Sequence, residues 1–316
     1  MGSHCSVTIF TLPATLLSTQ PEAPCLSRNT GITSGHAWKD TTMKRLCCAL
    51  ALSSLIFFCS PRIASHRGGT PVVSEPFDME SFGRRLALAS ELAADDRFAW
   101  ESSDSIIFAK PFVLDSTDKT WFIDKRAEGR LAFYGRYDTQ SDAYIVKSAF
   151  SCDSPGVVRR IPPDADERTH TIARIVAMGT RRFEEINDSL GLGVEFNHYI
   201  RRNDTGFWTM WFFPAGYDNY CAHGLDIIIT IDPQGNHITE CIIEGSYLRY
   251  FELERKAQKV ELDNGFDSMP SLGNLFFTCI NRHNFDTIAI INRGSVSRLV
   301  YRQDSDGWAW DHLRTD

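Results

Sequence analysis

Short apolar segments joined by turn-forming residues fill the C-terminal half of the chain, and this pattern constrains the fold most. Two hairpins are expected there, over residues 196–213 and 225–243. Their linkers, NDTG at 203–206 and DPQGN at 232–236, suit a type I turn followed by a left-handed glycine. Successive hairpins without an intervening helix indicate an antiparallel sheet.

Other apolar or aromatic segments bounded by turn residues also predict strands. They lie at residues 106–108, 121–123, 131–134, 144–146, 274–280, 286–291 and 296–301.

Two amphipathic helices are expected to pack on these strands. The first begins near Phe77 and ends near Asp96, with apolar residues at steps of two to four. The second begins at Asp164, which we expect to cap the helix while Glu167 reaches back to it, and continues to Leu190. The predicted fold class is therefore α+β, with an antiparallel β-sheet or sheets built from hairpins and two helices packed on the sheet.

Composition divides the chain into five segments. Residues 1–42 are rich in Ser, Thr and Pro and are interpreted as a disordered leader or an over-extended start. Residues 43–65 are interpreted as a signal peptide or a short N-terminal anchor. Two segments that each hold a helix and strands, 66–151 and 164–316, flank a linker at 152–163 that contains Pro and Gly.

The targeting interpretation depends on the sequence MKR at 43–45, which precedes an uncharged, largely apolar run at 46–59. A short cationic start followed by such a core is typical of a secretory signal peptide. The run is shorter than the roughly 20 apolar residues of a membrane-spanning helix. We therefore expect an exported protein, periplasmic or secreted, that meets a membrane only through this segment if it stays uncleaved.

The net charge disfavours polyanionic partners. The chain carries a formal charge of −7, and removal of residues 1–65 makes it more negative because that segment holds more bases than acids. Neither nucleic acid nor an anionic membrane surface is an expected partner.

Four cysteines lie beyond the expected signal segment, at Cys152, Cys221, Cys241 and Cys279. In an exported protein an even number allows two disulfides. Buried free thiols are the alternative, because cysteine is often simply buried.

Aromatic residues concentrate around segment 207–213, on both of its faces. A strand buried on both faces explains this pattern. The functional alternative is an exposed platform for a glycan or peptide, in which Trp208 or Trp211 would stack on the ligand. Tyr217 and Tyr220 would then lie on the following loop. These four aromatic residues are candidate binding residues.

Cys221, His223 and Asp226 bring a nucleophile, a base and an acid close together in the sequence. On a strand, however, Asp226 points to the opposite face from His223 and Leu225. Proximity in the sequence alone does not aim a histidine at a thiol. His223 and Asp226 are therefore candidate binding residues, and catalysis by them is the alternative.

No metal or cofactor is expected. Zinc-type ligands occur at Cys221, His223, His237 and Cys241. The expected register of the second hairpin places Cys241 opposite Ile227, about 13 Å along the strand from His223, too far for a shared metal. The sequence also lacks the phosphate-loop, dinucleotide, GxSxG and HExxH motifs.

The sequence thus predicts an exported, non-enzymatic binding or interaction module for a protein, peptide or glycan ligand. The alternative is an exported hydrolase-like enzyme that uses His223 and Asp226, with Cys221 as a possible nucleophile.

Overall fold

The computed structural model describes residues 7–8, 77–107, 114–153, 157–216, 219–245, 247–253, 259–264, 267–302 and 307–315. The expected signal segment at 43–65 lies outside these residues, as does the expected leader apart from β1 (Val7–Thr8). The described residues from Phe77 onward belong to one compact unit.

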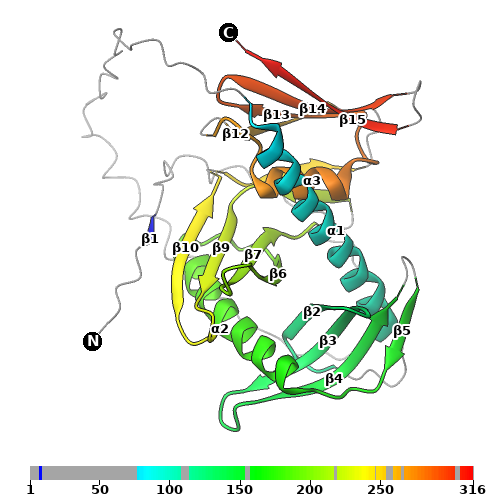
Figure 1. Ribbon diagram of the computed structural model, residues 1–316, viewed down its shortest axis with the longest axis vertical. Helices are drawn as coiled ribbons and strands as arrows, with labels where there is room; N and C mark the ends of the chain where they lie inside the picture. Colours follow the sequence, from blue (N-terminus) through cyan, green and yellow to red (C-terminus); the bar gives the residue numbers. More distant parts are fainter. Residues whose placement is uncertain are drawn as a thin grey trace, which may run out of the picture. The chain divides into compact units, whose positions relative to one another are not determined.

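The first half of this unit contains α1 (Met79–Ile107), β2 (Thr120–Arg126), β3 (Gly129–Asp138), β4 (Ala143–Cys152), β5 (Val158–Ile161) and α2 (Glu167–Leu190) (Figure 1). The second half contains β6 (Phe196–Arg202), β7 (Trp208–Pro214), β8 (Tyr220–His223), β9 (Asp226–Ile231), β10 (Ile238–Glu244), β11 (Arg249–Glu252), β12 (Lys259–Asn264), α3 (Leu272–Asn281), β13 (Thr287–Asn292), β14 (Ser295–Arg302) and β15 (Gly307–Arg314). Strand β5 lies within the segment interpreted as a linker.

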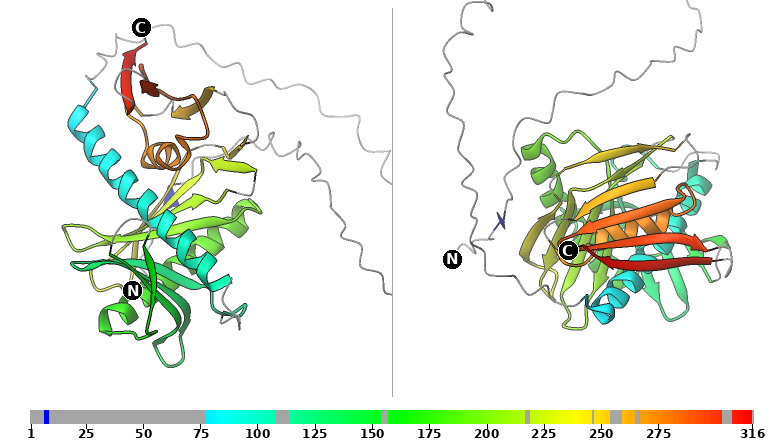
Figure 2. Two further views of the ribbon diagram at one scale, coloured as in Figure 1. Left: turned by 90° about the vertical axis from the view of Figure 1, so that its right-hand side faces the viewer. Right: turned by 90° about the horizontal axis from the view of Figure 1, so that it is seen from above.

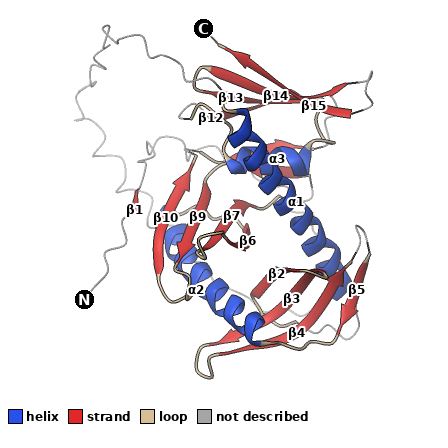
Figure 3. Cartoon of the chain, viewed as in Figure 1, coloured by secondary structure: helices blue, strands red, loops and turns tan. Residues whose placement is uncertain are grey.

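The strands form sheets in the orders β2-β3-β4-β5, β1-β10-β9-β7-β6, β11-β8 and β12-β13-β14-β15 (Figure 3). All neighbouring pairs are antiparallel except β1 with β10 and β12 with β13. The predicted α+β class with antiparallel sheets is confirmed.

Strand β7 is buried on both faces, which explains its aromatic content. Trp208, Met210 and Phe212 pack in the core that α2 completes between two sheets. Trp211 and Phe213 alternate with them and pack in a second core with α1 and α3. The strand therefore contributes side chains to two cores at once.

Helix α1 is longer than expected (Figure 2). Its side chains contribute to two hydrophobic cores. Phe82 and Leu92 pack with α3 and β13, whereas Phe98 and Ile106 pack against the β2–β4 strands. The predicted end near Asp96 and the predicted strand at 106–108 are wrong, because the helix continues to Ile107. No helix among the described residues is long and apolar enough to cross a bilayer.

Buried ion pairs explain why the acidic residues in the middle of α1 do not end the helix. Arg130 Nε donates to Asp95 Oδ1 over 2.7 Å, and Arg201 pairs with the other oxygen of the same carboxylate. Partners on β3 and β6 thus compensate the buried charge, so that Asp95 is compatible with a helix interior.

Helix α3 occupies the segment predicted as a strand at 274–280. Ser271 caps it by accepting from the backbone N–H of Asn274 over 3.1 Å. Nearly every residue of its first turns is buried, including the polar residues Asn274, Thr278 and Asn281, and periodicity alone does not distinguish a short buried helix from a buried strand. A third helix therefore joins the two that were expected.

Helix α2 begins at Glu167 and its cap is Asp166, not the expected Asp164. Asp166 Oδ1 accepts from the backbone N–H of Thr169 over 2.8 Å. Asp164 Oδ1 instead accepts from the adjacent Ala165 N–H over 3.0 Å. The helix starts two residues later than predicted.

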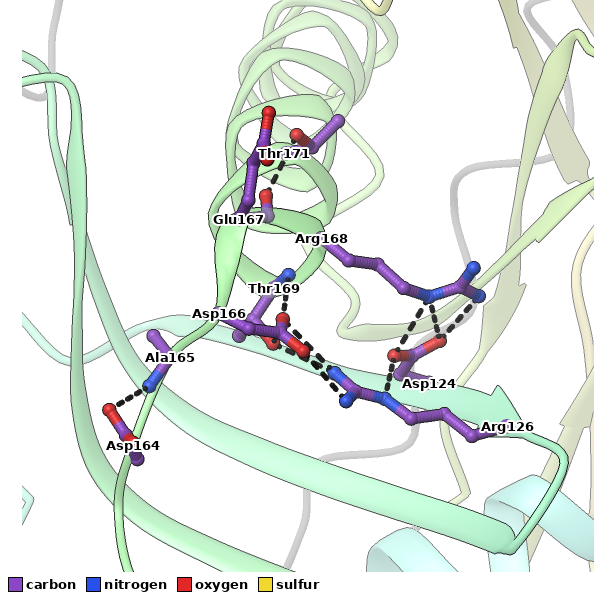
Figure 4. A network of polar contacts seen from close by, with 9 residues as sticks. All are labelled: Asp124, Arg126, Asp164, Ala165, Asp166, Glu167, Arg168, Thr169 and Thr171. Atoms are coloured by element: carbon purple, nitrogen blue, oxygen red, sulfur yellow. Dashed lines mark hydrogen bonds and ion pairs between the residues drawn. The ribbon is translucent and has the colours of Figure 1, made fainter.

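Two arginines tie this cap to β2 (Figure 4). Arg126 donates to Asp166 Oδ2 and to Asp124 Oδ2, each over 2.7 Å. Arg168, in the first turn of α2, donates to Asp124 Oδ1 over 2.8 Å. Asp124 is buried, and the paired guanidinium groups compensate its charge.

Both expected hairpins form, but the register of the second differs from the prediction. Cys241 lies opposite Ile229 rather than Ile227, and the register shifts between Ile238 and Glu240. Such an irregularity adds a residue to one strand, and the turn sequence alone does not reveal it.

Candidate ligand-binding cleft

A cleft of about 660 Å³ is lined by residues of α1, α3 and the β6–β9 strands. Its volume falls within the roughly 300–1,000 Å³ of typical small-molecule sites. Cys221, His223 and Asp226 all line it, together with Tyr220. The structure thus brings four residues singled out in the sequence to one concave surface.

The rim of the cleft carries exposed aromatic side chains. Trp100 of α1 is 58% exposed and Tyr220 of β8 is 44% exposed, and both line the cleft together with the exposed side chain of Ile280 on α3. Exposed aromatic rings beside a concave site are suited to stacking on a ligand. Sequence reasoning missed Trp100 because it lies beyond the predicted end of the first helix.

The other aromatic candidates have different positions. Trp208 and Trp211 are 6% and 8% exposed, and they pack in the two cores as the buried-strand interpretation predicted. Neither ring lines the cleft. Tyr217 lies outside the described residues.

His223 forms part of the cleft floor and is only 4% exposed. Its Nε2 lies 2.8 Å from Oδ1 of Asn274, and with the amide in this orientation Nε2 carries the proton. The other ring nitrogen, Nδ1, is buried without a hydrogen-bond partner among the described residues. Burial lowers the pKa of His223 to about 4. At neutral pH, Nδ1 is therefore an uncharged acceptor.

Asp226 reaches the same floor because the chain turns sharply between β8 and β9. Gly224 and Leu225 both adopt positive φ angles, 99° and 56°, so β9 does not continue the direction of β8. Asp226 is 5% exposed, and among the described residues no donor or cation pairs with its carboxyl group. Burial and the neighbouring Glu244 raise its pKa well above the ordinary value.

The geometry of Cys221 differs from that of an activated nucleophile. Its thiol donates to the carbonyl oxygen of Phe251 over 3.7 Å rather than to His223. Burial raises the pKa of Cys221 to about 12, so the thiolate is scarce at neutral pH. The thiols of Cys221 and Cys279 are free.

Asp96 contributes a second buried carboxyl group to the cleft. The hydroxyl of Tyr199 donates to its Oδ1, and the amide of Asn197 lies 3.4 Å from the same oxygen. Burial raises the pKa of Asp96. Sequence reasoning missed this residue because acidic residues there were interpreted as the end of a helix.

The described part of the chain contains no group of three or more His, Cys, Asp or Glu side chains arranged to hold a metal ion. The cleft combines exposed aromatic side chains with buried polar side chains. Comparison with known proteins gave no match to a protein-family model and no curated relative.

Proposed function

We propose that the protein is an exported, non-enzymatic binding protein that takes its ligand into this cleft. One observation carries the proposal: exposed Trp100 and Tyr220 line the same cleft as the buried side chains of His223 and Asp226. Nδ1 of His223 has no partner, and Asp226 forms no hydrogen bond or ion pair among the described residues. Apolar walls with a few convergent polar groups are the usual design of a ligand site. Export rests on the apolar segment that follows Lys44 and Arg45.

The ligand proposed from these features is a peptide or a glycan, or the end of one. Aromatic rings stack on sugar faces and on apolar side chains alike, and the polar floor would fix the orientation of the bound group. The acidic chain disfavours a nucleic acid.

A hydrolase that uses His223 and Asp226 is the alternative, and their position in one cleft with Cys221 is the observation that favours it. The raised pKa of Cys221 and its hydrogen bond to Phe251 favour binding instead. Hydrolysis of a panel of ester, peptide and glycoside substrates, lost in a folded His223→Ala variant, would support the enzyme.

The binding proposal is tested with the intrinsic tryptophan fluorescence of the protein. A panel of dipeptides, oligosaccharides and small aromatic compounds is titrated against the wild type and against Trp100→Ala and Tyr220→Ala. The matched control is Tyr301→Ala, since Tyr301 is an exposed aromatic residue on β14 that does not line the cleft.

We expect at least one class of compound to bind, with the two rim variants weaker by about tenfold and the control unchanged. Equal losses in the control, or no binding by any compound, would contradict the proposal. Export is tested separately by fractionation and N-terminal sequencing of the native protein. An intact chain that begins at Met1 in the cytosol would exclude it.

A further inference from the structure

The floor of the cleft holds two acceptors without partners, and one buried donor beside His223, Nδ2 of Asn274, also lacks a partner among the described residues. Nδ1 of His223 carries a lone pair without a partner, and the Asp226 carboxyl group, which lies against Gly273 in the first turn of α3, forms no hydrogen bond or ion pair among the described residues. Both side chains are more than nine-tenths buried. Buried polar groups are normally paired, so this arrangement is complete only when something else supplies donors.

Arg97, Arg130 and Arg282 line the cleft, and none of them forms an ion pair with Asp226 among the described residues. Two further arginines, close enough to affect the pKa of His223 or of Glu244, bond elsewhere. Arg249 lies opposite His223 in the β8–β11 pair, but its Nη1 donates to the Glu261 carbonyl over 3.2 Å. Arg85 of α1 donates to Asp267 and to the Pro270 carbonyl. Neither guanidinium group forms an ion pair with Asp226.

A second acid lies beside the floor. Glu244 of β10 lies directly opposite Asp226 of β9 in the sheet. Burial raises the pKa of Glu244 as well, with Asp267 adding to the effect and Arg85 opposing it. A raised pKa favours the neutral form of both acids, and no cation is paired with Asp226 among the described residues. A bound cation that donates hydrogen bonds would lower these pKa values and supply the counter-charge that the ionised form lacks.

We propose that the cleft binds a primary amine, whose ammonium group sits on the floor against Asp226 and His223. This inference rests on the proposed binding function and names its ligand class. An ammonium group supplies three donors and no acceptor, which matches an acceptor floor. Trp100 and Tyr220 at the rim suit an apolar or aromatic body attached to the amine, and their ring faces also attract cations.

A hydroxyl group fits the same floor less well. It supplies one donor but brings lone pairs of its own, and it leaves the buried acid without a counter-charge. An anionic ligand group would face Asp226 and Glu244 directly. A free amine of a peptide therefore agrees with the floor better than a neutral glycan does.

The test compares two probes of nearly the same shape, phenethylamine and 2-phenylethanol. Their binding to the full chain is followed at neutral pH by calorimetry and tryptophan fluorescence. We expect phenethylamine to bind at least about tenfold more tightly, since a charge-assisted hydrogen bond contributes more than a neutral one. Equal affinities, or no binding of phenethylamine at millimolar concentration, would overturn the inference.

The variant Asp226→Asn sharpens the test because an amide keeps the shape of a protonated carboxyl group. If the ligand needs a counter-charge, Asp226→Asn loses the preference for phenethylamine. If the contact is a neutral hydrogen bond, the variant keeps its affinity and the inference fails. The control is Asp104→Asn, which removes the same charge at an exposed position on α1 away from the cleft.

The probes also separate this inference from the broader proposal. Binding of 2-phenylethanol or an oligosaccharide that depends on Trp100 but not on Asp226 would retain the ligand-binding cleft and exclude the amine. The comparison of two ligands on the wild type remains decisive even if Asp226→Asn fails to fold.

Discussion

Gly273 of α3 lies directly against the Asp226 carboxyl group: a Cβ atom added to the glycine would stand 1.6 Å from Asp226 Oδ2. Helix α3 can approach β9 this closely only because residue 273 has no side chain. Both residues line the cleft.

Gly273→Ala is therefore expected to destabilise the protein by about 1–3 kcal/mol, although alanine favours a helix over glycine. The added methyl group must displace either the carboxyl group or the helix. Chemical denaturation measures the change in the free energy of unfolding. In an Asp226→Ala background the same substitution should cost much less, because the obstructing atoms are gone. A stabilising Gly273→Ala in the wild type would show that the floor is not packed in this way.

Asp226→Asn is expected to raise stability at neutral pH while it weakens the binding of the amine. The folded-state pKa of Asp226 is raised by burial and by Glu244, so the folded protein holds this proton more tightly than the unfolded chain does. Stability is then lost as the pH rises from the unfolded pKa of 3.8 toward the raised value.

The gain from Asp226→Asn should accordingly grow with pH and vanish below pH 3.8, where both states of the wild type are protonated. Thermal unfolding of the two proteins across this range provides the measurement. A gain that does not change with pH would mean that Asp226 does not titrate in this way.

Local patterns in the sequence predicted the two hairpins but not every strand or helix. Alternating side chains and glycine-containing turns predicted the hairpins of β6 with β7 and β9 with β10, because a two-residue period and a tight turn are local properties. Helix α3 was missed because periodicity alone does not distinguish a short, mostly apolar buried helix from a buried strand.

The sequence analysis identified only those residues of the cleft that lie close together in the chain. His223, Asp226 and Tyr220 lie within seven residues of one another, so their chemistry stood out. Trp100 and Asp96 come from α1, more than 100 residues earlier, and only tertiary packing brings them to the same surface. Their positions could be predicted only from the packing of α1 against β6 and α3.

The cap of α2 gives a direct test of where that helix begins. Asp166→Ala should cost at least about 1 kcal/mol, because it removes the acceptor of the Thr169 N–H and also the partner of Arg126. Asp164→Ala, at the cap expected from the sequence, should change the free energy of unfolding by no more than about 0.5 kcal/mol. Urea denaturation compares the two variants. A larger loss for Asp164→Ala would contradict the observed start of the helix.

His198 of β6 should make the protein sensitive to acid. Its Nε2 donates to the Trp121 carbonyl over 2.7 Å, and burial lowers the pKa of His198 to about 4 from 6.5. Between these two values the unfolded chain binds a proton that the folded protein does not, so stability falls as the pH falls.

His198→Gln replaces the titrating imidazole with an amide that does not titrate but can still donate a hydrogen bond to the Trp121 carbonyl. Between pH 6.5 and pH 4 the pH dependence of its unfolding free energy should be shallower than that of the wild type, by up to about 1.4 kcal/mol per pH unit. Urea denaturation at a series of pH values checks this. His223 shows the same direction of pKa shift, but it is present in both proteins, so the difference between them isolates His198. Parallel pH profiles would mean that His198 is protonated equally in the folded and unfolded states and that its burial does not exclude the charged ring.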